Sequence, residues 1–115
     1  MLEVGEEEFE RLVESALSTI PRDLSRAMRN VAIFIEDESP PGGPILFGLY
    51  QGIPLTQRGS GYAGVLPDRI TIYARAICAI CDTEDQVAEQ VRRTVIHEVG
   101  HYFGLGDERL RELGW

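Results

Sequence analysis

The run HEVGHYFGLGD at residues 97–107 constrains the fold of this chain more than any other part of the sequence. His97 and His101 are four residues apart, so on a helix they lie one turn apart on the same face and can reach one metal ion. Glu98 follows the first histidine, where a general base can face a metal-bound water. Asp107 supplies an oxygen ligand, and this set leaves the fourth tetrahedral position open, as a catalytic Zn²⁺ site requires.

The end of this helix is predicted at Gly104, between the second histidine and the aspartate. Glycine adopts the left-handed conformation at a helix end without a Cβ penalty, which lets the chain turn back and bring Asp107 to the metal. The alternative is a buried helix end with two hydrogen-bonded histidines and no metal. Both histidines of the chain fall in this motif, which favours the metal site.

Length and composition limit the classes of protein that need to be considered. The 115 residues predict a single domain, 1–115, and a hydrophobic share of 43% is enough for a core. A net charge of −8 disfavours nucleic-acid partners, since nucleic-acid-binding domains are usually basic. The acidic start MLEVGEEEFERL is not a signal peptide, and no apolar run approaches the roughly 20 residues that span a bilayer. We therefore expect no membrane partner and a cytoplasmic location.

The two cysteines, Cys78 and Cys81, form a C-x-x-C pair. One such pair is only half of a structural zinc site, and the pattern around it is not thioredoxin-like. Two small buried hydrophobic residues are the favoured interpretation, and a reversible local disulfide is the alternative.

Hydrophobic periodicity and turn residues predict an α+β fold, with a small sheet beside the helix that carries the histidines. Thr83 and Gln86 form a capping box at the start of that helix. The expected helices are 6–20, 84–103 and 107–115, with a short helical turn up to Met28; the expected strands are 31–37, 45–51 and 69–75; the expected loops are 39–44 and 52–68.

Three blocks of the chain resemble the zincin metallopeptidases with a metzincin-like HExxHxxGxxD signature, and more closely a family of small bacterial zincin-like proteins. The blocks are LFGLYQGIPLTQR (46–58), LPDRITIYAR (66–75) and HEVGHYFGLGD (97–107). The resemblance implies a compact minimal zincin-like fold with a small mixed sheet packed beside the active-site helix. It also implies Zn²⁺ as the cofactor, His97, His101 and Asp107 as its ligands, and Glu98 as the base. An aspartate as third ligand is similar to the snapalysin-type bacterial peptidases.

The chain departs from the metzincin signature after the third ligand. Metzincins carry a methionine in a turn beneath the zinc, whereas the eight residues after Asp107 contain none, and Met1 and Met28 lie upstream. These eight residues are also too few for the C-terminal subdomain that forms one wall of a peptidase cleft. This departure keeps open an alternative, a catalytically weak or inactive zincin-fold module that binds an unidentified protein partner.

The favoured hypothesis is a zinc-dependent peptidase that hydrolyses peptide bonds of a peptide or protein substrate. Glu98 would take the proton of the zinc-bound water and pass it to the leaving amine. Strand 69–74 is expected to offer its edge to an extended substrate by strand addition. Tyr62 or Tyr73 is a candidate to hold the developing oxyanion, and ordinary packing is the alternative for each.

Two features of the sequence weigh against the other functions. A purely structural zinc site needs neither a base at Glu98 nor an aspartate ligand, which disfavours a vestigial metal site. A bacterial ribosomal-RNA endoribonuclease family shares a similar spacing, H-x-x-x-H-x-x-G-x-x-H, but lacks the glutamate after the first histidine. Glu98 and the acidic composition therefore disfavour a nuclease.

Overall fold

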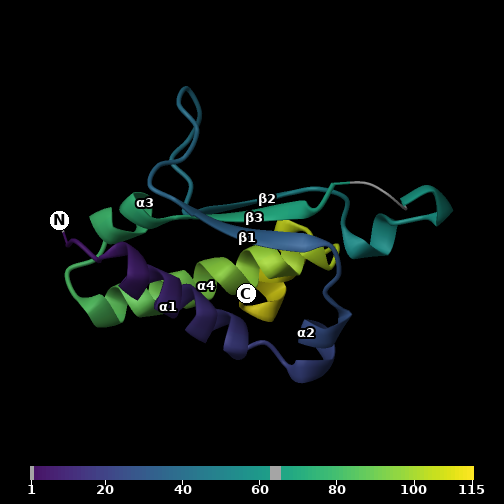
Figure 1. Cartoon of the computed structure of the whole chain (residues 1–115), viewed down its shortest axis with the longest axis horizontal. Helices are drawn as coiled ribbons and strands as arrows, with labels where there is room; N and C mark the ends of the chain where they lie inside the picture. The colour runs from purple at the N-terminus through teal and green to yellow at the C-terminus, as the bar shows by residue number, and fades with distance from the viewer. Residues whose placement is uncertain (1, 63–65) are drawn as a thin grey trace.

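The computed structural model of the chain describes residues 2–62 and 66–115. In Figure 1 the strands form one layer, and α4 lies against the sheet with α1 beside it. This arrangement confirms the α+β fold with a small mixed sheet. In chain order the elements are α1 (Glu6–Ser18), α2 (Arg22–Ala27), β1 (Val31–Glu36), β2 (Gly48–Gln51), the 3₁₀ turns η1 (Leu55–Gln57) and η2 (Ser60–Tyr62), β3 (Asp68–Tyr73), α3 (Ala74–Ala79), α4 (Glu84–Tyr102) and α5 (Asp107–Leu113).

The sheet has the strand order β1-β3-β2, with β3 in the centre. β1 runs parallel to β3 and pairs Val31 with Asp68, whereas β2 runs antiparallel and pairs Gly48 with Ile72. The prediction that strand 69–74 offers a free edge is therefore wrong, because β3 is hydrogen-bonded on both sides. Both faces of β3 are covered, because Thr71 and Tyr73 are buried as well as Ile70 and Ile72. The outer edge nearest α4 belongs to β2.

The core lies between the sheet, α1 and α4. One face of α4 carries a valine every four residues, and all four are at most 1% exposed: Val87, Val91, Val95 and Val99. Phe9, Val13 and Ala16 of α1 belong to the same cluster. This burial fixes the rotation of α4 about its axis, and hence the direction in which the histidines on its flank project.

The start of α4 has the predicted cap. The hydroxyl of Thr83 accepts a hydrogen bond of 3.1 Å from the backbone N–H of Gln86. The side-chain oxygen of Gln86 accepts in turn from the backbone N–H of Asp82, one residue before the position that a standard capping box uses. The helix therefore begins where the sequence predicts it.

Cys78 and Cys81 are both 5% exposed and carry free thiols, which agrees with two small buried hydrophobic residues. Burial raises the pKa of both thiols, which keeps them protonated and less reactive. Within the described residues, no helix is both long and apolar enough to cross a bilayer.

Candidate metal centre

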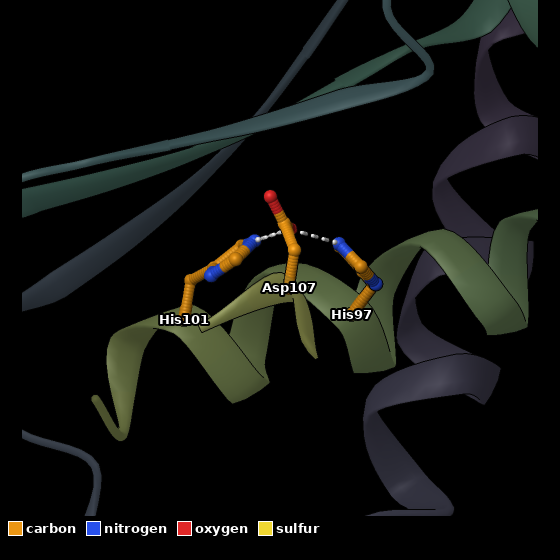
Figure 2. Close-up of side chains that lie close together, drawn as sticks. All are labelled: His97, His101 and Asp107. Carbon is orange, nitrogen blue, oxygen red and sulfur yellow. Dashed lines mark ion pairs between the residues drawn. The ribbon is translucent and has the colours of Figure 1, made fainter. Parts of the chain in front are cut away.

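The structure brings together His97, His101 and Asp107, which were singled out from the sequence (Figure 2). The Nε2 atoms of His97 and His101 lie 3.4 and 3.2 Å from Oδ1 of Asp107. Four ligands held about 2.0–2.1 Å from a tetrahedral zinc ion are roughly 3.3 Å from one another. The distances from the aspartate to both histidines therefore match the spacing of zinc ligands.

The far side of each imidazole faces a backbone carbonyl. Nδ1 of His101 lies 2.8 Å from the oxygen of Leu105, and Nδ1 of His97 lies 3.3 Å from the oxygen of Trp115. A carbonyl oxygen only accepts hydrogen bonds, so these contacts favour the tautomer with the proton on Nδ1. The Nε2 lone pairs then converge on the Asp107 carboxylate. Unless an Nε2 atom carries a proton, three acceptors face one another here, and a divalent metal ion fits this donor set.

A Schellman motif ends α4 and turns the chain back toward the histidines. The N–H of Gly104 donates to the oxygen of His101, and the N–H of Leu105 donates to the oxygen of Gly100. Gly104 has a φ of +94°, in the left-handed region, as the sequence predicted. A Cβ at this position would lie 2.2 Å from Oγ1 of Thr56 in η1. The turn therefore needs glycine both for its backbone conformation and for its contact with η1.

Asp107 is the first residue of α5, and the contact of α5 with α4 sets its position. Leu110 of α5 is fully buried against Gly100 of α4, where a Cβ would lie 2.3 Å from Cδ2 of the leucine. The close approach of the two helices holds the carboxylate beside the histidines. The side chain of Asp107 is 76% exposed, so the centre opens to solvent on this side.

Glu98 lies in the angle between α4 and β2 and is 7% exposed. Gly48 makes this position possible, because a Cβ there would lie 2.7 Å from Thr94 and 3.1 Å from Cγ of Glu98. Burial raises the pKa of Glu98, while His101, His97 and a hydrogen bond from the backbone N–H of Tyr50 act in the opposite direction. A carboxylate with a raised pKa is better suited to accept and return a proton near neutral pH.

Two cavities meet at Glu98 and His97. One, of about 400 Å³, extends toward the start of β2 and the middle of α4. The other, of about 570 Å³, extends along β2 to η1 and the Gly104 turn, and it also reaches His101 and Asp107. Together they place the candidate base and metal ligands within one open cleft.

The two tyrosines proposed for oxyanion stabilisation do not line the described parts of these cavities. Tyr73 is buried in β3 at 3% exposure. The Tyr62 hydroxyl accepts a hydrogen bond of 2.8 Å from the Asn30 side chain, and its ring contacts the guanidinium of Arg58 at 4.3 Å. Both therefore have packing roles. Tyr50 does line the larger cavity, although its hydroxyl donates to the carboxylate of Asp68.

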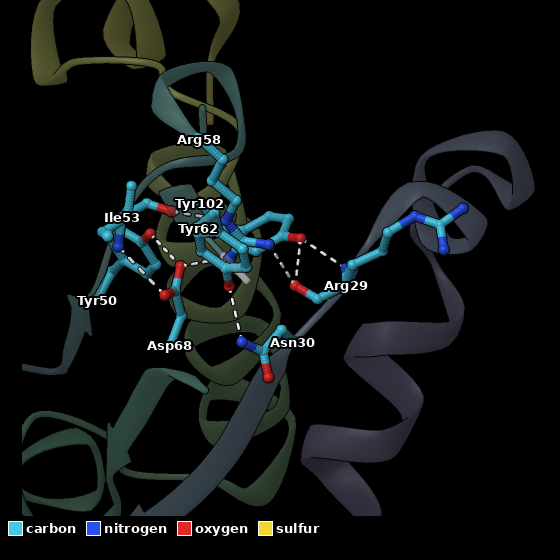
Figure 3. A network of polar contacts seen from close by, with 8 residues as sticks. All are labelled: Arg29, Asn30, Tyr50, Ile53, Arg58, Tyr62, Asp68 and Tyr102. Carbon is cyan, nitrogen blue, oxygen red and sulfur yellow. Dashed lines mark hydrogen bonds and ion pairs between the residues drawn. The ribbon is translucent and has the colours of Figure 1, made fainter. Parts of the chain in front are cut away.

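Sequence reasoning missed a buried polar network that joins the 52–62 loop to the rest of the fold (Figure 3). Its centre is an ion pair of 2.8 Å between Arg58 and Asp68, whose side chains are 8% and 3% exposed. Arg58 also donates to the carbonyl of Arg29 at 2.8 Å, and its guanidinium lies 5.0 Å from the ring centre of Tyr102. The network anchors the loop that places Thr56 against the Gly104 turn. Only the Gly- and Pro-rich composition of this loop was visible beforehand.

Comparisons with known proteins identify the family and the fold of the chain. Residues 28–115 match the family described as Zincin-like metallopeptidase. Among solved structures, the chain is similar to a conserved hypothetical protein from Thermus thermophilus, with 24% sequence identity and a TM-score of 0.60. That similarity covers 96% of this chain and 97% of the other, and it supports the fold alone. No curated protein matches the chain.

Proposed function

Because the chain belongs to the Zincin-like metallopeptidase family, we propose that it is a zinc-dependent peptidase. His97, His101 and Asp107 hold the ion, and Glu98 is the general base. The observation that carries this proposal is the convergence of three metal-binding acceptors beside a buried carboxylate in an open cleft. A site with three protein ligands keeps a position for water or substrate, as a catalytic zinc site does.

When bound, zinc supplies Lewis acidity for the scissile carbonyl and lowers the pKa of the attacking water. Glu98 accepts the proton of that water on its carboxylate and then donates it to the nitrogen of the leaving amine. In the metal-free protein, burial opposes the charged form of Glu98 and raises its pKa. The carbonyls of Leu105 and Trp115 hold the two imidazoles in the orientation that directs Nε2 at the ion.

The edge of β2 is the place at which a peptide substrate would bind. Among the strands that the structure describes, β2 has one neighbour, β3, and its residues Gly48 and Tyr50 line the cleft above Glu98. An extended peptide added to this edge would gain main-chain hydrogen bonds and carry its carbonyl past the metal ligands. This assignment replaces the edge expected at residues 69–74.

The test is hydrolysis of a quenched fluorescent peptide library by zinc-loaded protein, with Glu98→Gln and His97→Ala as variants. Glu98→Gln should retain the metal and lose about 10²–10⁴ in rate, since it lacks only the general base. His97→Ala should lose both metal and activity. Elemental analysis after dialysis gives the metal content of each protein. Full zinc occupancy without cleavage in the wild type would overturn the peptidase proposal and favour the partner-binding module.

A further inference from the structure

The smaller cavity beside Glu98 is lined by a positively charged side chain, Arg93, that has no part in the proposed chemistry. Phe47 and Gly48 line it from the β2 side, and α4 contributes Gln90, Arg93 and Thr94. Trp115 adds an apolar surface, and His97 and Glu98 lie where the cavity meets the candidate metal centre. Apart from the two histidines, Arg93 is the one basic side chain among the described residues that line the two cavities of the cleft.

The position of Arg93 follows from helix geometry. It precedes His97 by four residues, so it lies on the same face of α4 and roughly 6 Å earlier along the axis. An extended peptide advances about 3.3 Å per residue. The guanidinium is therefore within reach of the side chain one or two residues from the scissile bond.

The guanidinium of Arg93 is exposed, and the described residues give it no ion pair or hydrogen bond. Glu89, one turn earlier, is bound through both carboxylate oxygens by Arg92. The amide of Gln90 donates to the hydroxyl of Thr94 at 3.1 Å. Glu89 also attracts the guanidinium of Arg93 electrostatically, without an ion pair or hydrogen bond between the two side chains. The N–H donors of Arg93 therefore remain available to a ligand.

We propose that Arg93 is a specificity-determining residue that binds a carboxylate of the peptide, close to the scissile bond. This inference rests on the proposed peptidase function. Arginine binds carboxylates through two parallel hydrogen bonds, while Phe47 and Trp115 offer apolar surface to the methylene groups of Asp or Glu. A chain with a net charge of −8 repels acidic peptides in general, so their selection needs a local cation.

The direction of β2 determines on which side of the scissile bond the carboxylate bound by Arg93 lies. Antiparallel pairing is the more stable mode of strand addition. A peptide antiparallel to β2 places its C-terminal half beside Gly48, where the β2 strand begins and the Arg93 cavity lies. The carboxylate selected by Arg93 is therefore on the C-terminal side of the cleaved bond. It belongs either to an acidic side chain or to the end of the peptide itself.

The test compares zinc-loaded wild type with Arg93→Gln and Arg93→Glu, and with Arg26→Gln as a control of equal charge change on α2, remote from the cleft. Matched peptides carry Glu, Gln or Lys at the first two positions after the scissile bond, each with a free or an amidated C-terminus. We expect the wild type to cleave the Glu peptides or the free acids about five-fold more efficiently, mainly through KM. Arg93→Gln should remove the preference, Arg93→Glu should shift it to Lys, and Arg26→Gln should keep it.

A binding measurement separates failure of this inference from failure of the peptidase proposal. Fluorescence anisotropy with zinc-loaded Glu98→Gln protein reports peptide binding without turnover. Tighter binding of the carboxylate peptides that is lost in Glu98→Gln/Arg93→Gln supports the role of Arg93 even if the wild type cleaves nothing. Two results overturn it: cleavage or binding with no preference either for Glu over Gln and Lys or for free over amidated C-termini, or a preference that survives Arg93→Gln.

Discussion

Replacing Gly104 with alanine tests how the chain delivers Asp107 to the histidines. Gly104 has a φ of +94°, where a residue with a Cβ pays about 1–2 kcal/mol. The added Cβ would also lie 2.2 Å from Oγ1 and 3.2 Å from Cβ of Thr56. Rotation of the Thr56 side chain relieves the first contact, but the second remains and requires η1 to shift. Overpacking of this kind adds about 1 kcal/mol, which brings the total to about 2–3 kcal/mol.

Gly42 provides a matched control for this substitution. It has a φ of +83°, and a Cβ there would meet nothing within 4 Å. Gly42→Ala therefore pays the backbone cost alone and lies far from the ligands in sequence. We expect Gly104→Ala to lower the melting temperature by about 8–12 °C, at about 4 °C per kcal/mol, and Gly42→Ala by about half as much. A Thr56→Gly background should recover the difference.

The assay combines urea unfolding of the metal-free proteins with zinc competition against a chelator. Gly104→Ala should weaken zinc binding because the turn carries Asp107, whereas Gly42→Ala should not change it. Equal stability losses in the two variants, with zinc affinity retained in both, would refute the reasoning. They would show that neither the contact with Thr56 nor the turn geometry determines the position of the carboxylate.

Three further predictions address the ligands, the base and the polar network. His97→Ala should hold substoichiometric zinc after reloading and dialysis, by elemental analysis; equal metal in variant and wild type would contradict the ligand assignment. Burial raises the pKa of Glu98 in the folded state. Proton binding by Glu98 therefore stabilises the folded protein fully below the unfolded-state pKa, near 4.5, and this stabilisation is lost as the pH rises through the folded-state pKa. Metal-free Glu98→Gln should therefore be more stable than wild type at pH 7 and lose that advantage below about pH 4 in urea unfolding. Asp68→Asn leaves the buried Arg58 charge without its partner and should lower the free energy of unfolding by about 3–5 kcal/mol. Arg75→Gln, at a surface ion pair, should lower it by less than about 1 kcal/mol. Similar losses in the two variants would contradict a buried network.

Local signals in the sequence were sufficient for α1, α4 and α5 and for the proximity of the candidate ligands, whereas the expected strand 69–75 ends at Tyr73 and α3 begins at Ala74. The valine repeat and the Thr83 cap define α4, and helical spacing then aligns His97 with His101. Gly104 marks the reversal after that helix. These features involve residues close together in the chain, where periodicity and capping rules apply directly.

Strand order and the environment of the tyrosines depend on contacts between distant residues, and here sequence reasoning was wrong or silent. β3 follows β2 in the chain but lies between β1 and β2 in the sheet, so its edge is not free. Nothing local predicts that Arg58 reaches across a loop to Asp68, or that Tyr102 hydrogen-bonds the backbone of Arg29. The Gly- and Pro-rich composition of the 52–68 loop was the one available signal, and it does not indicate which side chains pair.

The geometry of the candidate metal centre depends on two glycines, Gly48 and Gly100, as much as on the candidate ligands and base. Without a Cβ at Gly48, β2 lies close enough to α4 for the Tyr50 backbone to reach Glu98. Without one at Gly100, Leu110 seats α5 against the same helix and holds Asp107 above it. Through these contacts, β2 and α5 each pack on α4 within one helical turn of a candidate histidine ligand. Adding a methyl group at either position should therefore displace one of the two candidate carboxylates, Glu98 or Asp107, while leaving every candidate ligand and base in the sequence. A search for the motif alone would count such a variant as intact.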